Sequence, residues 1–396
     1  MLAIISTVGT TVFGQPRTPL NEDVRKFRER RPSATELSNI LNSKDFEGRA
    51  IYEQALAELS VKPVDMLRRS VAELNAIEAI HERHNVRRGN AYYFLASETP
   101  DGMLAARVLA DFCRERYEAS ESTATKIDGL QVADPRKFRL TGLPYLVQTV
   151  YRFLESAKAK KLTPILNSTG GFKAAIPYLT LVGMLQGVEV STIHETSDVL
   201  ITLETLPITL DLEAIREIED ILEELDQAQE NGLSYDRLAR GLKLGHNQPI
   251  EDHPLWSLFE PYDDNYILSG LGSIALEELR AAKRKIQPVW LSQQAYERLQ
   301  KDFPEGSEAR RHFKEIFDRL KRPDYRKDPW RHEYKGAKFP AYKYKGNERL
   351  FFHEHSDGYV LVLELAQHVS DHDQSYDRVP GELSAYDKFW EWQGTF

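Results

Sequence analysis

One stretch near the middle of the chain, residues 167–175 (Asn-Ser-Thr-Gly-Gly-Phe-Lys-Ala-Ala), constrains the fold most. It follows an apolar run at residues 162–166 and leads into a helical pattern at residues 176–185. A strand that passes through small residues into a helix leaves backbone N–H groups and the positive end of the helix dipole free at the turn. The stretch therefore predicts an anion-binding cradle made of Asn167, Ser168, Thr169, Gly170, Gly171 and Lys173.

The alternative for the glycine pair is a tight turn in which both glycines serve backbone geometry only. A second stretch favours the cradle, because the apolar run at residues 2–6 also ends in small hydroxylated residues, among them Thr10 and Thr11. In a parallel sheet the loops that follow the strands gather along one edge, where such folds bind ligands. We therefore expect the two loops to share one site.

A third run, residues 91–96, predicts another buried strand, and a helix is expected at residues 103–117. Ser97 follows this strand and could line the ligand edge, whereas Thr99 or Asp101 could cap the helix. The repeated alternation of strand and helix favours a parallel, doubly wound α/β sheet. Residues 126–132 are expected to form a further strand or an edge segment, residues 198–203 a strand and residues 141–160 a helix.

The strand ending in Thr7-Val8-Gly9-Thr10 and the Asn-Ser-Thr-Gly-Gly-Phe-Lys stretch resemble the two motifs of CARF domains. These are CRISPR-associated, Rossmann-like sensors of cyclic oligoadenylates. The resemblance covers residues 1–210 and implies that cyclic oligoadenylate, with tetra-adenylate as the expected ring, binds these loops in a homodimer. Some CARF domains also cleave the ring slowly, and Thr10, Thr11, Ser168 and Lys173 could support that activity here.

The 396 residues suggest two or three domains. The single cysteine, Cys113, cannot form an internal disulfide, and no cysteine spacing suits a metal. No apolar run approaches the ~18–20 residues of a membrane span. We therefore expect a cytoplasmic protein with no membrane segment, no metal and no cofactor other than its allosteric ligand.

Charge is distributed unevenly. Residues 281–350 hold 19 Lys and Arg against 10 Asp and Glu, whereas the whole chain has a net charge of −9. Clustered positive charge is typical of a nucleic-acid-binding face, although it also occurs on solvated helices. Residues 211–230 hold nine acidic residues and predict an amphipathic helix.

Residues 211–287 are expected to form a helical connector. The stretch at residues 265–272 followed by a helical pattern resembles the wing and last helix of the winged-helix modules that often follow CARF domains. As a connector this module needs no DNA.

Residues 288–396 predict a small α+β domain, with helices at 292–302 and 306–322 and strands at 339–345, 348–354 and 358–368. Asp357-Gly358 predicts a hairpin turn between the last two strands. The order resembles the RelE superfamily of toxin endoribonucleases. The resemblance implies catalytic lysines at Lys343 and Lys345, a phosphate-contacting arginine at Arg349 and a catalytic tyrosine at Tyr376.

The second arginine of that family is missing, and His368 and His372 stand nearest to its place. RNA cleavage without a metal needs a proton acceptor, a proton donor and cations for the developing charge, which these residues could supply. A histidine metal site is disfavoured, because the spacings suit no standard ligand set. Trp330, Tyr334 and Tyr344 could stack on bases or belong to the core, and Trp390 and Trp392 are expected to pack.

Together these features predict a type III CRISPR effector in which a ring-bound sensor activates a ribosome-dependent mRNA endoribonuclease. Two alternatives stay open. One is a ligand-responsive winged-helix transcription regulator that binds DNA through residues 233–285, and the other is a ring nuclease with an inert tail. The acidic N-terminal two-thirds and the basic tail favour the effector.

Overall fold

The computed structural model describes residues 1–14, 18–29, 33–131, 134–171, 173–193, 199–203, 205–206, 208–245, 248–284, 287–326, 330–334, 337–344, 346–367 and 382–393. These form two compact units, residues 1–279 (unit 1) and 280–396 (unit 2). The domain boundaries expected after residues 210 and 287 stay predictions. Within the described residues, no helix has the length and apolar character needed to cross a bilayer.

Unit 1 is built on a six-stranded sheet of order β3-β2-β1-β4-β5-β6. All neighbours are parallel except β5 and β6, which are antiparallel. This is the strand order of a doubly wound, Rossmann-like sheet, here with an antiparallel sixth strand. The strands are β1 (Leu2–Thr7), β2 (Ala91–Ala96), β3 (Glu121–Lys126), β4 (Thr163–Asn167), β5 (Glu189–Ile193) and β6 (Leu200–Leu203).

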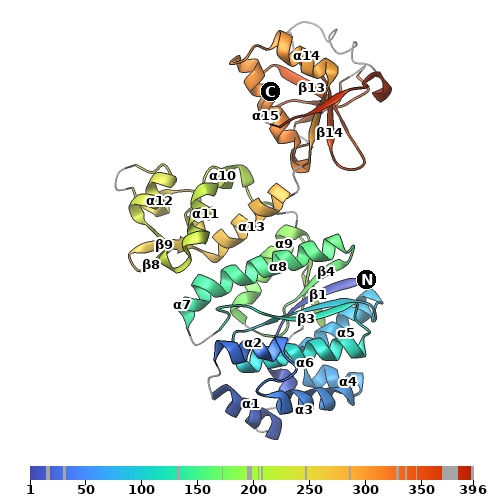
Figure 1. Cartoon of the computed structure of the whole chain (residues 1–396), viewed down its shortest axis with the longest axis vertical. Helices are drawn as coiled ribbons and strands as arrows, with labels where there is room; N and C mark the ends of the chain where they lie inside the picture. The colour runs from blue at the N-terminus through green and yellow to red at the C-terminus, as the bar shows by residue number, and fades with distance from the viewer. Residues whose placement is uncertain are drawn as a thin grey trace. The chain divides into compact units, whose positions relative to one another are not determined.

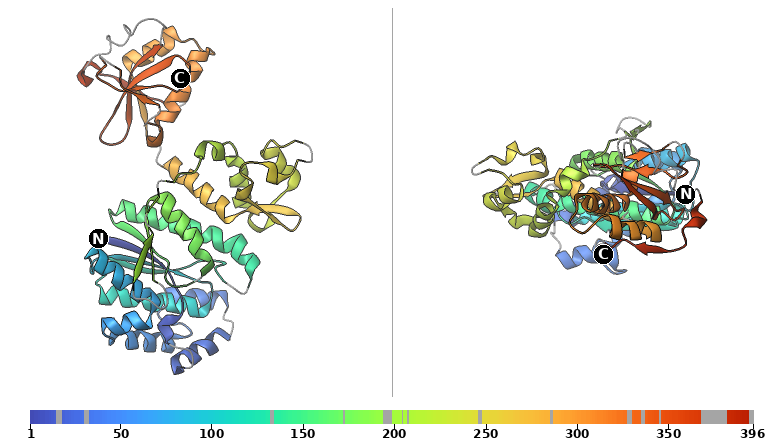
Figure 2. Two further views of the ribbon diagram at one scale, coloured as in Figure 1. Left: turned by 180° about the vertical axis from the view of Figure 1, so that it is seen from behind. Right: turned by 90° about the horizontal axis from the view of Figure 1, so that it is seen from above.

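Helices cover both faces of this sheet (Figure 1). One face carries α5 (Ala72–His84) and α6 (Pro100–Arg116), and the other carries α8 (Leu143–Ala159) and α9 (Ile176–Gln186). An outer layer packs on α5 and α6, as the reverse view in Figure 2 also shows. Its helices are α1 (Pro19–Glu29), α2 (Ala34–Asn42), α3 (Arg49–Ser60) and α4 (Val64–Ser70).

The central strands form because their residues are apolar and covered on both faces. Every residue of β1 and β2 is buried, as expected for a parallel sheet between two helical layers. The strands expected at residues 91–96 and 162–166 are confirmed as β2 and β4. The expectation of a strand at 126–132 is wrong, because β3 ends at Lys126. β3 consists mostly of polar, half-buried residues, so its sequence lacks the apolar run that marks a buried strand.

The acidic stretch at residues 211–230 forms two helices instead of one, α10 (Leu212–Arg216) and α11 (Glu219–Ala228). Ile218 leaves the helical region between them, with φ −117° and ψ 16°, and is itself buried. Residues 233–284 add two helices, α12 (Tyr235–Gly241) and α13 (Gly270–Arg284). They also form a three-stranded sheet of β7 (Leu233–Ser234), β8 (Phe259–Tyr262) and β9 (Asn265–Leu268). The hairpin β8–β9 leads directly into α13, which is the order expected for a wing and its following helix.

Unit 2 contains a six-stranded sheet of order β11-β12-β13-β14-β10-β15. Among its described strand pairs, only β10 and β14 are parallel. The strands are β10 (Val289–Ser292), β11 (Arg331–His332), β12 (Ala341–Tyr342), β13 (Glu348–Glu354), β14 (Val360–Gln367) and β15 (Phe389–Glu391). The sequence did not reveal β10, because four residues are too few to show an alternating pattern.

Two helices, α14 (Gln293–Asp302) and α15 (Glu308–Leu320), pack on one face of this sheet. Ser292 and Ser307 cap them through their hydroxyl groups. The β13–β14 hairpin confirms the expected turn, in which Gly358 has φ +91°. The α+β arrangement of helical pair and antiparallel strands therefore agrees with the sequence.

The close approach of residues 8 and 171 generates the first prediction. Gly171 has φ +86°, and a Cβ there would lie 2.8 Å from the Val8 carbonyl oxygen. Gly187 also has a positive φ, +62°, but has no atom within 4 Å of the same position. We expect Gly171→Ala to lower the free energy of unfolding by more than about 2 kcal/mol. Gly187→Ala should cost about 1 kcal/mol. Equal urea midpoints for the two variants would contradict the prediction.

Candidate functional site

The loops after β1 and β4 meet at one edge of the unit 1 sheet. β1 pairs with β2 on one side and with β4 on the other, so the direction of winding reverses between β1 and β4. Ligands of doubly wound sheets bind at such a switch point. The Thr7 hydroxyl donates to the Gly170 carbonyl oxygen, and a Cβ on Gly9 would lie 3.1 Å from the Gly171 nitrogen. We call residues 8–11 and 168–171 the switch-point loops.

Several groups expected to face a ligand instead bind neighbouring strands. Asn167 is buried, and its side chain donates to Ser6 Oγ at 3.1 Å and accepts from the Thr169 nitrogen at 3.2 Å. Ser168 is also buried and donates its backbone N–H to the Ser191 carbonyl at 2.9 Å. The Thr169 hydroxyl accepts from the Ile193 nitrogen at 3.0 Å. In this structure these three residues position the loop instead of presenting donors to solvent.

Glu73 is the residue that the sequence did not reveal. It lies in the first turn of α5, and its carboxylate accepts hydrogen bonds from the Gly9 nitrogen at 2.6 Å and the Thr11 hydroxyl at 3.1 Å. A Cβ on Gly170 would lie 1.8 Å from Glu73 Oε1, so this glycine makes room for the carboxylate. Burial raises the pKa of Glu73, and the bonds from Gly9 and Thr11 oppose the rise. No local pattern linked Glu73 to loops that are so distant in sequence.

Other groups of the loops reach the surface. Thr10, Thr11 and Lys173 are exposed, and Gly170 and Gly171 are half-buried. Ser97 lies after β2 and bonds with the Thr99 hydroxyl at 2.9 Å, while Thr99 caps α6 through the Gly102 nitrogen. The capping role expected for Thr99 is confirmed. No hydrogen bond among the described residues joins Ser97 to the switch-point loops.

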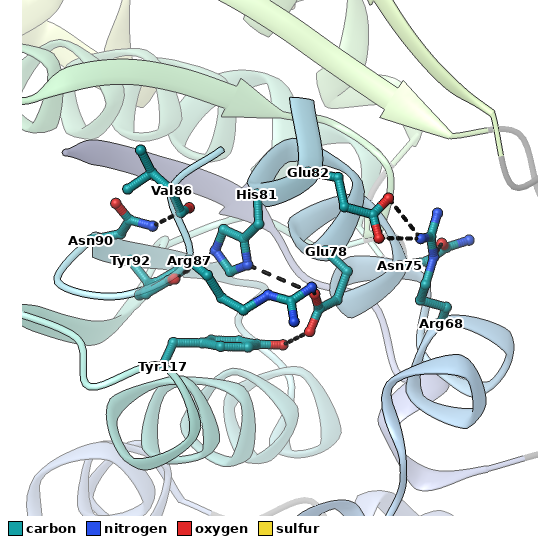
Figure 3. Close-up of polar contacts among 10 residues, drawn as sticks. All are labelled: Arg68, Asn75, Glu78, His81, Glu82, Val86, Arg87, Asn90, Tyr92 and Tyr117. Carbon is teal, nitrogen blue, oxygen red and sulfur yellow. Dashed lines mark hydrogen bonds and ion pairs between the residues drawn. The ribbon is translucent and has the colours of Figure 1, made fainter. Parts of the chain in front are cut away.

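A second buried polar cluster lies on the same helix as Glu73 (Figure 3). Glu78 accepts from the Tyr117 hydroxyl at 2.8 Å and pairs with Arg87 at 2.7 Å. His81 bonds through Nε2 to the Tyr92 hydroxyl at 2.8 Å. Burial alone would raise the pKa of Glu78, but the His81 ring 3.9 Å away, the hydrogen bond from Tyr117 and the charge of Arg87 hold it below its usual value. Because the carboxylate is fully buried and paired, this cluster anchors α5 to β2 and α6.

In unit 2 two of the expected nuclease residues, Lys343 and Arg349, lie on the sheet face opposite the helices. Leu350 and Tyr342 pack in the core beneath α14 and α15, whereas Phe351 and Ala341 form a separate cluster. Tyr342 pairs with Leu350 and Ala341 with Phe351, so continuing the register by one residue places Lys343 opposite Arg349. Both side chains therefore belong to the face without helices, and Lys343 is exposed.

Arg349 is held firmly in this position. Its Nε donates to the Tyr334 hydroxyl at 3.2 Å, and its Nη1 donates to the carbonyls of Gly346 at 3.2 Å and Glu348 at 2.7 Å. Only 4 % of the residue is exposed. Its Nη2 makes no hydrogen bond with any other residue that the structure describes. These bonds fix the guanidinium in one orientation, but its small exposed fraction leaves little of it for a phosphate to contact in this conformation.

The remaining expected catalytic residues, Lys345, His368, His372 and Tyr376, lie outside the described residues. In the described ranges, no group of three or more His, Cys, Asp or Glu side chains could hold a metal.

Two of the aromatic residues considered for base stacking pack against an arginine instead. The Arg319 guanidinium lies 4.7 Å from the Trp330 ring centroid and 3.8 Å from that of Tyr344. The packing role expected for Trp392 is confirmed, since it is buried and its Nε1 donates to Asp318 at 3.0 Å.

Part of unit 1 matches a known protein family. A family model described as CRISPR-associated protein (Cas_APE2256) matches residues 68–206, about a third of the chain. The match begins before Glu73 and includes the whole of the loop after β4. It supports a CRISPR-associated protein. A search of curated proteins found no match.

The pKa of Glu78 generates the second prediction. Because this pKa is lower in the folded chain than its ordinary value of 4.5, the ionised carboxylate stabilises the fold above that value. The contribution is lost as the pH falls through the lower folded pKa. We expect Glu78→Gln to cost about 2 kcal/mol at neutral pH, and the difference from wild type to shrink below about pH 4. Urea unfolding at both pH values measures this.

The matched control is Glu82→Gln. Glu82 lies on the same helix and forms an exposed ion pair with Arg68 at 2.9 Å, so its loss should cost less than about 1 kcal/mol. A Glu78→Gln cost that stays constant down to acid pH would contradict the assignment of Glu78 as an ionised anchor.

Proposed function

We propose that this chain is an ancillary effector of type III CRISPR immunity. Cyclic oligoadenylate binds the switch-point loops of a CARF homodimer and activates a metal-independent endoribonuclease in unit 2. The observation that carries the proposal is the meeting of two hydroxyl-bearing loops at the switch point, the second of them inside the CRISPR-associated match. The exposed Thr10, Thr11 and Lys173 are the groups that contact the ring phosphates.

The nuclease part of the proposal is supported by Lys343 and Arg349. Two cations on neighbouring strand positions suit a phosphate that gains charge during cleavage. The 2′-hydroxyl of RNA supplies the nucleophile, so the chemistry needs no metal. By resemblance to RelE toxins the substrate is mRNA on the ribosome. The excess of positive charge in residues 281–350 fits this partner.

A continuous set of contacts leads from the loop after β4 to the end of unit 1. Helix α9 follows that loop, and its Gln186 donates to Glu278 of α13 at 2.6 Å. Tyr178 of α9 fills the space beside Gly270, where a Cβ would lie 2.2 Å from the Tyr178 ring. Helix α13 runs to Arg284, past the end of unit 1. A shift of α9 on ring binding would therefore move α13 and the chain segment that enters unit 2.

The hairpin β8–β9 favours a connector over a DNA-binding wing. Its Glu260 pairs with Arg139, and Asp263, in the turn of the hairpin, lies 4.0 Å from Arg136. A wing on DNA needs cations for the phosphate backbone, whereas this hairpin presents carboxylates that pair with Arg136 and Arg139. We therefore prefer the sensor–effector arrangement to a transcription regulator.

Ring binding is tested by calorimetric titration of cyclic tetra- and hexa-adenylate into the full chain. We expect Lys173→Ala to weaken binding at least about tenfold, the value of one charge-assisted hydrogen bond, and Thr10→Ala to weaken it less. Arg88→Ala is the control, because Arg88 is an exposed cation that precedes β2 and so lies at the opposite edge of the sheet. Unchanged affinity in both loop variants would remove the site.

Ribonuclease activity is tested by mRNA cleavage in a bacterial translation extract and on naked RNA, with and without the ring. We expect ring-dependent cleavage that falls by about 10²–10³ in Arg349→Ala and Lys343→Ala, with ring binding intact. Arg311→Ala is the control, since Arg311 is an exposed arginine of α15 on the other side of the sheet. Full activity in Arg349→Ala would show that the nuclease assignment is wrong, and cleavage of naked RNA would remove the ribosome requirement.

A further inference from the structure

The Glu73 carboxyl group lies directly behind an exposed hydroxyl of the candidate ring site. Glu73 Oε2 accepts from the Thr11 hydroxyl at 3.1 Å, and Oε1 accepts from the Gly9 nitrogen at 2.6 Å. Glu73 is fully buried, whereas Thr11 is exposed. The exposed Thr11 hydroxyl therefore connects the buried carboxylate with the surface.

The hydrogen bonds of Thr11 fix the direction of its proton. Its Oγ1 accepts from the Ala72 nitrogen at 3.2 Å and donates to Glu73. A hydroxyl has one donor and two acceptor positions, so one acceptor position remains for an incoming hydroxyl group. Ala72 and Glu73 open α5, which means that one helix end orients both members of the pair.

Several features suit Glu73 to accepting a proton. A buried carboxylate binds a proton more tightly than an exposed one, and burial raises the pKa of Glu73. Its hydrogen-bond partners are backbone N–H groups, those of Gly9 and of Glu73 itself, and the Thr11 hydroxyl. The Glu78 network further along α5 holds the helix in place, so the pair is preorganised before a ligand arrives.

We propose that Thr11 and Glu73 form a proton relay through which this chain cleaves the cyclic oligoadenylate that it binds. This inference rests on the proposed ring-binding function. The 2′-hydroxyl of one adenylate attacks the adjacent phosphorus, so the O2′–P bond forms and the P–O5′ bond breaks. The 2′-hydroxyl proton passes to Thr11 Oγ1 while the Thr11 proton passes to Glu73 Oε2.

The leaving 5′-oxygen takes a proton from the exposed Lys173 ammonium group. The products are a 2′,3′-cyclic phosphate and a free 5′-hydroxyl, so no water, metal or redox partner is consumed. Afterwards Glu73 returns its proton through Thr11, and Lys173 regains one from solvent. Thr11 contacts the substrate, whereas Glu73 acts through Thr11 and is a positioning residue.

The test separates binding from cleavage in the full chain. Binding of cyclic tetra- and hexa-adenylate is measured by calorimetry, and cleavage by chromatography under single-turnover conditions. We expect Thr11→Val and Glu73→Gln to lower the cleavage rate at least about 100-fold, as for loss of a general base, while affinity changes less than tenfold. Thr11→Ser keeps the hydroxyl and should cleave within tenfold of wild type.

Glu73→Gln retains an oxygen that can accept from the Gly9 nitrogen, but its amide cannot take a proton, so it preserves the structural contact while removing the relay. Glu82→Gln, on the same helix but exposed, is the control and should cleave like wild type.

The outcomes distinguish the relay from the sensor. Wild-type cleavage in Thr11→Val or Glu73→Gln, or ring binding without any cleavage by wild type, overturns the relay and leaves the sensor. Loss of ring binding in Glu73→Gln shows that Glu73 is structural and also overturns the relay. Failure of wild type to bind either ring removes the sensor and the relay together.

Discussion

The parallel pairing of β1 with both β2 and β4 is the constraint on which the rest of unit 1 depends. Because β1 is bonded on both sides and covered on both faces, the direction in which its chain leaves the sheet is set. The polar residues after β1 must then emerge beside those after β4, where three glycines allow the two loops to touch. The candidate ligand site follows from this pairing, since no single loop contains all of its groups.

Helix α5 connects stability with chemistry. Its first turn places Glu73 between the loops, and its last turns hold Glu78 and His81 in a buried network with Tyr92, Arg87 and Tyr117. The two carboxylates differ in environment although they share a helix. Glu78 has a cation and several donors, so it is held ionised, whereas burial dominates at Glu73. One anchors the helix, and the other keeps a high affinity for a proton.

In unit 2 the two faces of the sheet are covered in different ways, one by helices and the other by side chains of residues 334–339 and 383–389. The helices α14 and α15 take the apolar side chains of one face, which leaves the alternate residues of β12 and β13 on the other. Lys343 is two residues from Ala341, and Arg349 is two residues from Phe351. Because residues two apart in a strand point the same way, both share the face of the paired Ala341 and Phe351. Tyr334 and two backbone carbonyls hold the Arg349 guanidinium, so the strand ladder and the loop before it together define its orientation.

The sequence by itself determined the features that depend on local pattern. These are the buried strands β2 and β4, the helices α6, α8, α14 and α15, the Asp357-Gly358 hairpin and the two small-residue loops, because periodicity, caps and turn residues act over a few positions. Only the tertiary structure decided that Asn167 and Ser168 face inward and that Glu73 lies behind Thr11. It also decided that the Arg319 guanidinium packs against the rings of Trp330 and Tyr344. These facts depend on contacts between residues far apart in the chain, and the free energy of such contacts is set by burial and pairing that no local pattern encodes.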